Sequence, residues 1–493
     1  MDHKEYLKMI DETIGAGPYK ADWGSLSCHK TPDWYYKAKF GIFIHWGLYS
    51  VPAYSNEWYS RHMYDPAHHE YDFHRKHFGD QKEFGYKDFI PMFRGENFDA
   101  EEWAALFKEA GAKYVMPVCE HHDGFAMYDT EFNRWNAAKM GPCRNIAGEL
   151  KKACEAEGLV FCASTHRAEH FFFMNMGRAF ESDVTDEEYR DFYGPAYLCP
   201  ELFSDAVFTT TQDTFTKAVP TEEWLEDWLV RTCELIDKYQ PKILYFDWWI
   251  HIAPFKPYLK KLCAYYYNRA EEWGTEVTIN YKHEAFAPGV ATFDVERGAL
   301  TGISPVPWQT DTAIGKHSWG YTKDNEFKPA RQIICDLVDI VSKNGMLLLN
   351  IGPKPDGSIT DEERAVLKET GKWMKINGEG IYGTVPFRVF GEGDVNNPEG
   401  AFMDNDEKQF TSSDYRFTYK DGFLYAFCMR PDSESFVIRT LKIKGEHDFI
   451  TGSVEVLGDL KVKDVRRDKE GLHIVTGKKT GSDRPLCFKI EIT

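Results

Sequence analysis

Short apolar runs alternate with longer amphipathic segments between about residues 35 and 380. The runs are nearly continuous in apolar character and end at polar residues or glycine, which is typical of strands buried on both faces of a parallel sheet. They are Phe40–His45, Tyr114–Cys119, Leu159–Ser164, Ile243–Asp247, Val277–Asn280, Thr292–Glu296 and Met346–Ile351. Such strands interleaved with helices predict an α/β fold, namely a (β/α)8-like TIM barrel. The sequence places seven strands and not the eighth, so it leaves open whether the barrel is regular.

The segments between the runs carry signals for helix ends. Asp99 and Thr360 are each followed by a glutamate three residues later, which predicts helices that begin with a capping box. Thr221 and Pro329 are expected to begin two further helices. Gly378 is suited to the left-handed position that ends the helix starting at Thr360.

The pattern changes after about residue 384, where shorter and often alternating runs begin. These runs are Phe423–Met429, Ser435–Ile443, Ser453–Leu457, Leu472–Thr476 and Cys487–Ile492. Lys420-Asp421-Gly422 between two runs is typical of a hairpin turn. We therefore predict a catalytic (β/α)-barrel domain over residues 1–383 and a C-terminal β-sandwich domain over residues 384–493.

Composition excludes several classes of partner. The net charge of −19 repels phosphate backbones and anionic membranes, so neither nucleic acid nor a membrane is an expected partner. No run of about 18 apolar residues is present, so no membrane span is expected. The 11 cysteines are scattered singly, without a CxxC pair, and the first residues do not resemble a secretory signal. We expect a cytoplasmic protein, or a secreted or periplasmic one if a leader has been removed. The oligomeric state is not predicted.

Two carboxylates stand at the ends of predicted strands, where a barrel carries its catalytic groups. Asp247 ends the run ILYFDWW and Glu296 ends TFDVERG. Asp294 points to the same side of its strand as Glu296, so it is an alternative to Glu296. Two carboxylates on separate strands are what a glycosidase requires. The enzyme is retaining when the two carboxyl groups lie roughly 5–5.5 Å apart and inverting when they lie roughly 6.5–9.5 Å apart. The structural alternatives are a turn cap for Asp247 and an ion pair with Arg297 for Glu296.

Histidine and aromatic residues follow the first and second predicted strands. The segments FGIFIHWG and NEWY bring His45, Glu57 and Trp58 together within a short stretch. Aromatic faces stack on the apolar side of a pyranose, and histidine and glutamate bind its hydroxyls. The histidines between residues 62 and 77 and the segment HRAEH lack a zinc-site spacing such as HExxH. We therefore predict no metal and no cofactor, and we expect residues 62–77 to form solvated loops.

Six segments together resemble the α-L-fucosidases of glycoside hydrolase family 29. They are FGIFIHWGLYS, NEWY, AKYVMPVCEHHDGFAMYDT, LYFDWW, KHSWGY and LVDIVSKNGMLLLNIGPKPDG, in the family's order between residue 34 and about residue 384. The resemblance implies a retaining exo-α-L-fucosidase that removes terminal fucose from oligosaccharides or glycoconjugates through a covalent fucosyl-enzyme intermediate. It implies Asp247 as the nucleophile, Glu296 as the acid/base and no cofactor.

The resemblance also implies which residues bind the sugar. These substrate-binding residues are His45, Glu57, Trp58, His121 and His122, with Trp319 against the C5 methyl of fucose. Many family members have a tyrosine before Ser164, where this chain has Ala163, and we expect His166 to take the place of that tyrosine. Tyr245, two residues before Asp247, is expected to line the same pocket.

Other functions stay open from the residues alone. A barrel glycosidase for another sugar, such as a galactoside, would need similar groups, and a carbohydrate-binding protein without activity would need the aromatic residues alone. A metal-dependent hydrolase is a further alternative. The linkage cleaved and the leaving group depend on loops such as 65–97 and 171–220, which carry no recognisable motif. The C-terminal domain is either structural or contributes a loop to the site.

Overall fold

A closed parallel barrel forms the larger part of the protein in a computed structural model, which describes residues 1–196, 219–396, 399–443 and 451–492. Its strands are β1 Phe40–Ile44, β2 Tyr114–Glu120, β3 Val160–Phe161, β4 Ala163–Thr165, β5 Ile243–Phe246, β6 Thr278–Tyr281, β7 Thr292–Glu296, β8 Trp308–Ala313 and β9 Gly345–Ile351. Consecutive segments β3 and β4 make one barrel strand, because both pair with β2. The sheet closes because β1 pairs with β9 on one side and β2 on the other.

All seven predicted runs are strands, and the missing strand of the barrel is β8. Its sequence, WQTDTA, is polar at the four central positions although every residue is buried. Gln309 and Asp311 find partners inside the barrel, where Tyr35 donates to Gln309 and Tyr245 donates to Asp311. Such a strand has no apolar run in its sequence, because its burial depends on hydrogen bonds rather than on apolar side chains.

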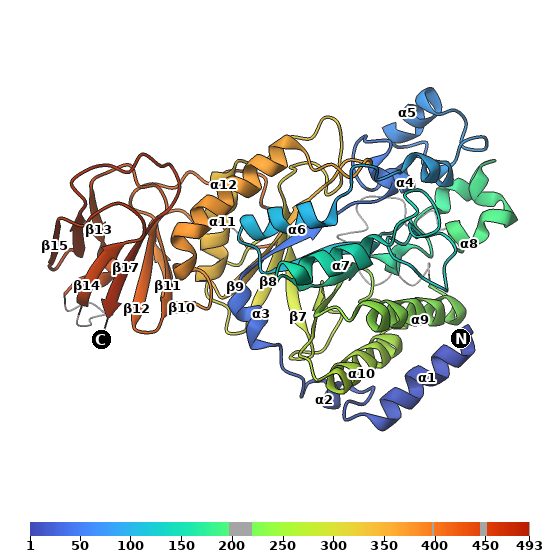
Figure 1. The fold of residues 1–493 in the computed structure, drawn as a ribbon, viewed down its shortest axis with the longest axis horizontal. Coiled ribbons are helices and arrows are strands. Elements are labelled where there is room, and N and C mark those ends of the chain that lie inside the picture. Colours follow the sequence, from blue (N-terminus) through green and yellow to red (C-terminus); the bar gives the residue numbers. More distant parts are fainter. Residues whose placement is uncertain (197–218, 397–398, 444–450, 493) are drawn as a thin grey trace.

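Six long helices cover the outside of the barrel (Figure 1). They are α6 Ala100–Glu109, α7 Ile146–Ala156, α9 Glu222–Tyr239, α10 Lys256–Trp273, α11 Ala330–Ser342 and α12 Asp361–Asn377. The described connections 282–291 and 297–307 contain no helix, so the barrel is irregular beside β7. Phe293, on the outer face of β7, is consequently 40% exposed.

Further helices surround this framework. They are α1 His3–Ala16, α2 Trp23–Leu26, α3 Asp33–Ala38, α4 Tyr59–His62, α5 His69–His77 and α8 Arg190–Tyr193. The N-terminal helix α1 packs against α9 and α10, as Figure 1 shows. None of the described helices has the length and apolar character needed to cross a membrane.

The predicted helix starts agree with the structure. Asp99 accepts hydrogen bonds from the first turn of α6, Thr221 accepts one from the first turn of α9, and Thr360 accepts one from the first turn of α12. Pro329 directly precedes α11. The prediction for Gly378 is wrong, because its φ is −58° and the chain continues into a 3-10 turn. Glycine is needed there because a Cβ would lie 2.7 Å from the ring of Tyr382.

The histidine-rich segment also differs from its prediction as solvated loops. Helix α5 occupies His69–His77, and His62 and His74 are buried. The Nδ1 atom of His74 lies 3.0 Å from the Tyr59 hydroxyl, and its Nε2 lies 2.8 Å from the carbonyl of Phe84. Each ring nitrogen of His74 therefore has a hydrogen-bond partner within the protein, so this polar side chain can be buried away from water. Part of the 171–220 loop, residues 197–218, lies outside the described residues.

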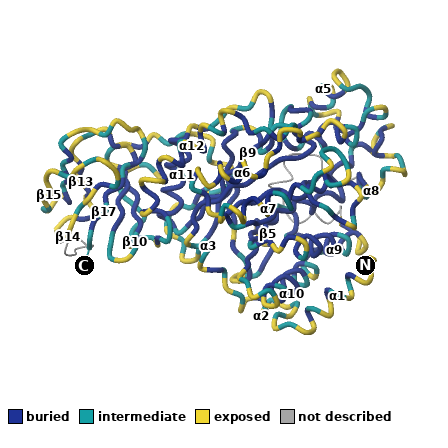
Figure 2. Tube along the Cα trace, in the orientation of Figure 1, coloured by how far each residue is buried: buried dark blue, intermediate teal, exposed yellow. Residues whose placement is uncertain are grey.

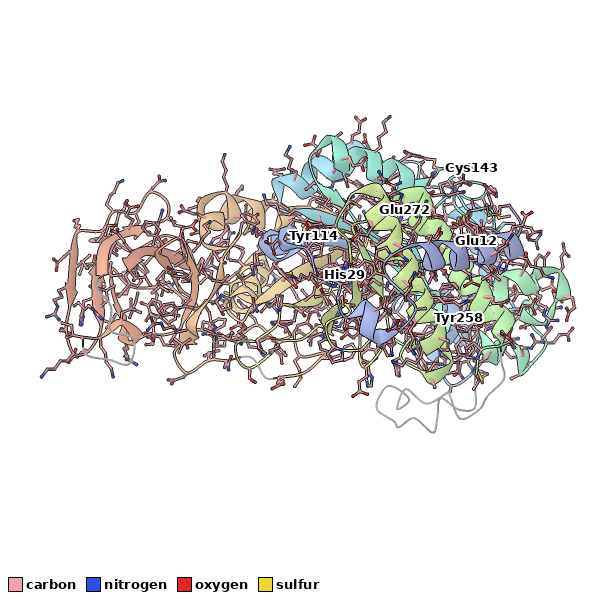
Figure 3. The ribbon with its side chains drawn as sticks, turned by 90° about the horizontal axis from the view of Figure 1, so that it is seen from below. Glu12, His29, Tyr114, Cys143, Tyr258 and Glu272 are labelled. Atoms are coloured by element: carbon pink, nitrogen blue, oxygen red, sulfur yellow. The ribbon has the colours of Figure 1, made fainter. Side chains whose placement is uncertain are left out.

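The C-terminal part is built from two antiparallel sheets, at the left of Figures 1 and 3. One sheet has the order β10-β11-β12-β17-β14 and the other β13-β16-β15. The strands are β10 Val385–Glu392, β11 Tyr415–Lys420, β12 Phe423–Cys428, β13 Ser435–Ile438, β14 Thr451–Val456, β15 Asp464–Arg467, β16 Leu472–Val475 and β17 Leu486–Ile492. Asp421 and Gly422, with φ of 52° and 85°, make the predicted hairpin turn.

Burial follows these two parts of the chain, with the barrel strands buried almost throughout (Figure 2). A separate apolar core joins the two C-terminal sheets, where the rings of Phe436 and Phe488 lie 5.0 Å apart. The predicted fold class, a barrel followed by an all-β sandwich, is confirmed. The first antiparallel strand begins at Val385, and the division after residue 383 stays a prediction. The ten described cysteines are free thiols, most of them buried.

The close approach at Gly378 gives a test of packing. Gly378→Ala should lower the free energy of unfolding by about 1–3 kcal/mol, because the added methyl must displace the Tyr382 ring. Thermal melting of the purified variant measures the loss. Gly15→Ala is the matched control, since no atom lies within 4 Å of the position that its added methyl would take, and no loss is expected. Equal melting temperatures for Gly378→Ala and the parent protein would contradict the packing account.

Candidate active site

A cavity of about 440 Å³ lies at the carboxyl ends of the barrel strands. This volume is within the range of small-molecule sites and holds a monosaccharide with part of an attached group. All ten residues predicted for the site line it: His45, Glu57, Trp58, His121, His122, His166, Tyr245, Asp247, Glu296 and Trp319. Residues that the sequence did not assign also line it, namely Phe43, Asn56, His62, Glu169, Trp248, Asp311 and Phe402.

Asp247 is held as a carboxylate by the imidazoles around it. It is the first residue after β5, and one of its oxygens lies 3.1 Å from Nδ1 of His166 and 3.6 Å from Nε2 of His122. Burial alone would raise the pKa of Asp247, but His166, His122 and Lys282 outweigh burial and hold that pKa below its usual range. Asp247 therefore carries a negative charge at neutral pH.

Glu296 has the opposite tendency. It is the last residue of β7, and its carboxylate accepts a hydrogen bond from the Trp248 indole. Nζ of Lys282 lies 3.4 Å from the same oxygen. Burial raises the pKa of Glu296 to about 7, with Lys282 opposing the rise and the charge of Asp247 adding to it. A carboxyl of this kind holds its proton in neutral solution and below.

The two acidic residues of β7 have different positions. Asp294 faces the same side as Glu296 but lies two residues earlier, roughly 6–7 Å deeper along the strand. Its side chain is fully buried, 2.9 Å from Nζ of Lys282, and it does not line the cavity. The alternation of side chains could not distinguish the two residues, because both face the same side of β7. Their depth along the strand does, and Glu296 is the one of this pair that lines the cavity.

Glu169 is a third carboxyl in the cavity, and the sequence patterns did not indicate it. It lies in a 3-10 turn, Arg167–Glu169, and is 1% exposed. One oxygen lies 3.7 Å from Nε2 of His122. Burial and then the charge of Asp247 raise the pKa of Glu169 well above its usual range, so it is a neutral acid. In the segment HRAEH the spacing of the two histidines is the recognisable feature, and the glutamate between them belongs to no motif.

The fold fixes one nitrogen of several cavity imidazoles. Nδ1 of His45 lies 2.7 Å from the Asn350 side-chain oxygen, and Nδ1 of His122 lies 2.8 Å from the carbonyl of His166. Nε2 of His166 lies 2.7 Å from the hydroxyl of Ser164. Burial lowers the pKa of His45 well below its usual value and that of His122 to about 3, so both rings are neutral at physiological pH.

His121 and His122 both line the cavity although they are adjacent in the sequence. Strand β2 ends at Glu120, so the alternation of side chains along a strand does not apply to them. Their rings are 4.3 Å apart and inclined by 65°. Burial and then the neighbouring His122 lower the pKa of His121 well below its usual value. The turn after β2 therefore supplies two imidazoles to one pocket.

Glu57 and Trp319 belong to one wall of the cavity. One oxygen of Glu57 accepts hydrogen bonds from the Ser318 hydroxyl at 3.0 Å and from the backbone N–H of Trp319 at 2.9 Å. The Trp319 ring stacks on His45 with centroids 5.1 Å apart. The side chain of Asn350 donates to the Trp319 carbonyl, so it positions both rings of the stack.

Three groups of described side chains could offer nitrogen or oxygen atoms to a metal near the cavity, and one of them is His122, His166 and Asp247. His45, His121 and His166 have ligand atoms within 4.8 Å of one another, and three imidazoles are a donor set that zinc accepts. His62, His68 and Glu70 form a second group, but the two imidazoles are stacked 3.9 Å apart at an angle of 7°. The lone pairs of the two rings therefore lie in separate, nearly parallel planes, which does not suit binding of one ion by both rings.

These features define a class of protein. A closed parallel barrel carries, at its strand ends, the ionised Asp247 and the protonated Glu296 in a sugar-sized cavity with aromatic walls. This arrangement is that of a glycoside hydrolase.

Comparison with known proteins identifies the family. The family model described as alpha-L-fucosidase matches residues 7–379. The tissue alpha-L-fucosidase of Homo sapiens is 31% identical over 380 residues, which cover 75% of this chain and 73% of that protein. The Thermotoga maritima alpha-fucosidase in complex with fucose matches with a TM-score of 0.73 at 29% identity, covering 96% of this chain and 99% of that chain. The chain belongs to the alpha-L-fucosidase family of glycoside hydrolases.

The different pKa values of the two carboxyls predict the pH dependence of catalysis. For a fucosyl disaccharide, whose leaving group needs a proton, kcat/KM should fall as pH rises above about 7, because Glu296 loses its proton there. The acidic limb should lie below about pH 4, since the pKa of Asp247 is below its usual value. A pH series of initial rates measures both limbs. A value of kcat/KM that keeps rising from pH 6 to pH 9 is incompatible with this assignment.

Proposed function

We propose that this chain is a retaining exo-α-L-fucosidase that hydrolyses terminal fucose from fucosylated oligosaccharides or glycoconjugates by double displacement. One observation carries the proposal: the pKa values of Asp247 and Glu296 are shifted in opposite directions inside one cavity. Asp247 attacks the anomeric carbon as a carboxylate, and Glu296 gives its proton to the departing oxygen. Glu296 then takes a proton from the water that releases the sugar.

The change of role at Glu296 follows from the charges around it. In the free site, the negative charge of Asp247 contributes to the raised pKa of Glu296. Formation of the ester between Asp247 and the sugar removes that charge, while the cation of Lys282 remains nearby. The pKa of Glu296 therefore falls after the first step, and the proton it has given away is not quickly regained. The residue is then ready to act as a base.

The remaining cavity residues fit the chemistry of a 6-deoxy sugar. Neutral imidazoles and the carboxylate of Glu57 can bind sugar hydroxyls, and the rings of Trp58 and Trp319 offer apolar surface. Burial of one methyl contributes about 0.8 kcal/mol. A sugar with a 6-hydroxyl, such as a galactoside, would leave that hydroxyl unpaired against an apolar wall at a cost of about 1–3 kcal/mol. The Thermotoga maritima relative in complex with fucose supports fucose as the sugar.

The proposal extends to the position of the bond cleaved. Phe43, Tyr245 and Asp311 line the cavity from β1, β5 and β8, within the barrel itself. Side chains from the strands therefore close its inner end, so a terminal sugar residue fits and a longer chain cannot pass through. The linkage is not assigned, and the cytoplasmic localisation stays a prediction from the cysteine pattern.

Substitution of the nucleophile tests the first step. Asp247→Gly should lower kcat for an aryl fucoside by at least about 10³-fold, because no covalent intermediate can form. Sodium azide should restore part of the rate, since the shorter side chain leaves room for a small anion to attack the anomeric carbon. The product would then be a fucosyl azide of inverted configuration, which is detected by NMR. Full activity of Asp247→Gly without azide would refute the assignment.

Substitution of the acid/base tests the second role. Glu296→Ala should reduce kcat/KM for fucosyl disaccharides by about 10²- to 10⁴-fold, because their leaving groups need a proton. A dinitrophenyl fucoside should suffer a much smaller loss in its first step, since its leaving group departs without protonation. Asp294→Asn and Glu169→Gln, assayed on the same pair of substrates, show whether another buried carboxyl gives the same pattern. Equal losses on both substrates for Glu296→Ala would count against proton donation.

A further inference from the structure

One aromatic side chain in the cavity comes from outside the barrel. Phe402 lies between β10 and β11, more than 100 residues after Glu296, and it lines the same cavity. Its side chain is large and apolar, yet the residue is 55% exposed. Among the described residues that line the cavity, it alone follows residue 384. Because the residue lines the cavity and is exposed, its ring is available to contact a ligand bound there.

The backbone around Phe402 is fixed to the end of β7. Its N–H donates to the carbonyl of Glu296 at 3.0 Å, and the N–H of Met403 donates to the carbonyl of Arg297 at 2.8 Å. The φ of Phe402 is 58°, in the left-handed region that bulky residues rarely adopt. Such a conformation costs on the order of 1–3 kcal/mol and persists only where the surroundings enforce it.

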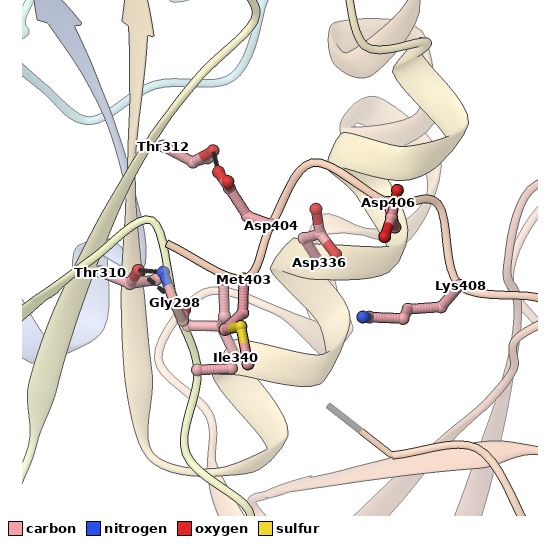
Figure 4. A pocket seen from close by; sticks show the side chains of 10 residues that line it. Gly298, Thr310, Thr312, Asp336, Ile340, Met403, Asp404, Asp406 and Lys408 are labelled. Carbon is pink, nitrogen blue, oxygen red and sulfur yellow. Dashed lines mark hydrogen bonds between the residues drawn. The ribbon is translucent and has the colours of Figure 1, made fainter. Parts of the chain in front are cut away.

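An ionic anchor follows directly in the chain. The carboxylate of Asp404 lies 3.1 Å from Nε of Arg297 and 2.5 Å from Nζ of Lys328. It also accepts a hydrogen bond from Thr312 of β8, which Figure 4 shows. Arg297, Thr312 and Lys328 all belong to the barrel, so the segment carrying Phe402 is tied to the barrel at several points.

The position of the leaving group follows from the role of Glu296. A proton passes directly from an acid to the departing oxygen only within hydrogen-bond distance, so the departing group lies beside the Glu296 carboxyl. The indole of Trp248 donates to that carboxyl, and the backbone of Phe402 is bonded to Glu296 itself. Trp248 and Phe402 both line the cavity there. The departing group is therefore next to two aromatic rings.

We propose that Phe402 and Trp248 form a stacking platform for the sugar on the leaving-group side of the scissile bond. Phe402 is then a specificity-determining residue of the fucosidase, and this inference rests on the function proposed above. The occupant is a neutral pyranose, whose face of C–H groups packs on aromatic rings. No lysine or arginine is among the described residues lining the cavity, so a sugar with a negative charge would find no cation there.

Two substrates separate stacking from catalysis. α-L-Fucosyl fluoride has no ring on the leaving-group side, whereas a fucosyl disaccharide has one. The disaccharide is chosen as the best substrate of the parent enzyme among α1,2-, α1,3-, α1,4- and α1,6-linked compounds with a neutral second sugar. In Phe402→Ala, the ratio of kcat/KM for the disaccharide to kcat/KM for the fluoride should fall by about 5- to 50-fold. Phe402→Trp should restore most of the ratio, because it restores a ring.

Phe293→Ala is the matched control. Phe293 lies on the outer face of the same strand, β7, is 40% exposed and does not line the cavity, so its removal should leave the ratio unchanged. An unchanged ratio in Phe402→Ala, or an equal fall in Phe293→Ala, would overturn the inference while leaving the proposed function intact. A parent enzyme that releases fucose from neither substrate would instead overturn the proposed function.

Discussion

A buried lysine inside the barrel is the interaction on which the site depends. Lys282 is 1% exposed, and its ammonium group lies 2.9 Å from Asp294, 2.9 Å from Asp311 and 3.4 Å from Glu296. A charge in such a place is stable only when it is paired and hydrogen-bonded. The first two carboxylates hold the pKa of Lys282 well above its usual value despite burial. The cation in turn connects the ends of β6, β7 and β8, where the described connections leave the outside of the barrel without helices.

The same cation contributes to the difference between the two reacting carboxyls. It lowers the pKa of both Asp247 and Glu296. Asp247 has the additional help of His166 and His122, whereas the further donor to Glu296 is the neutral indole of Trp248. Burial acts on both groups in one direction, so the neighbours decide which carboxyl keeps a proton. Local surroundings, and not the choice between aspartate and glutamate, therefore distinguish the proposed nucleophile from the proposed acid.

Apolar periodicity and helix caps predicted most of the barrel, because strands such as β5 and β9 bury continuous apolar runs. Strand β8 was not predicted because its buried side chains are polar and interact with charged groups inside the barrel. Site residues at strand ends, such as Asp247, could be predicted because the apolar run of a strand also shows where that strand ends. Glu169 stands in a short 3-10 turn, and Phe402 meets Glu296 across more than 100 residues. Neither local pattern nor spacing carries information about such distant contacts.

The residues matched by the family model end at residue 379, before Phe402. The proposed nucleophile, acid and sugar-binding imidazoles all lie within the matched part. Phe402 belongs to a later segment, which the Asp404 anchor, backbone bonds and contacts of Asn405 and Glu407 tie to the barrel. Under the proposed roles, a change of residue 402 would alter the surface offered to the departing sugar, while the two carboxyls and the imidazoles around them would keep their places in the barrel.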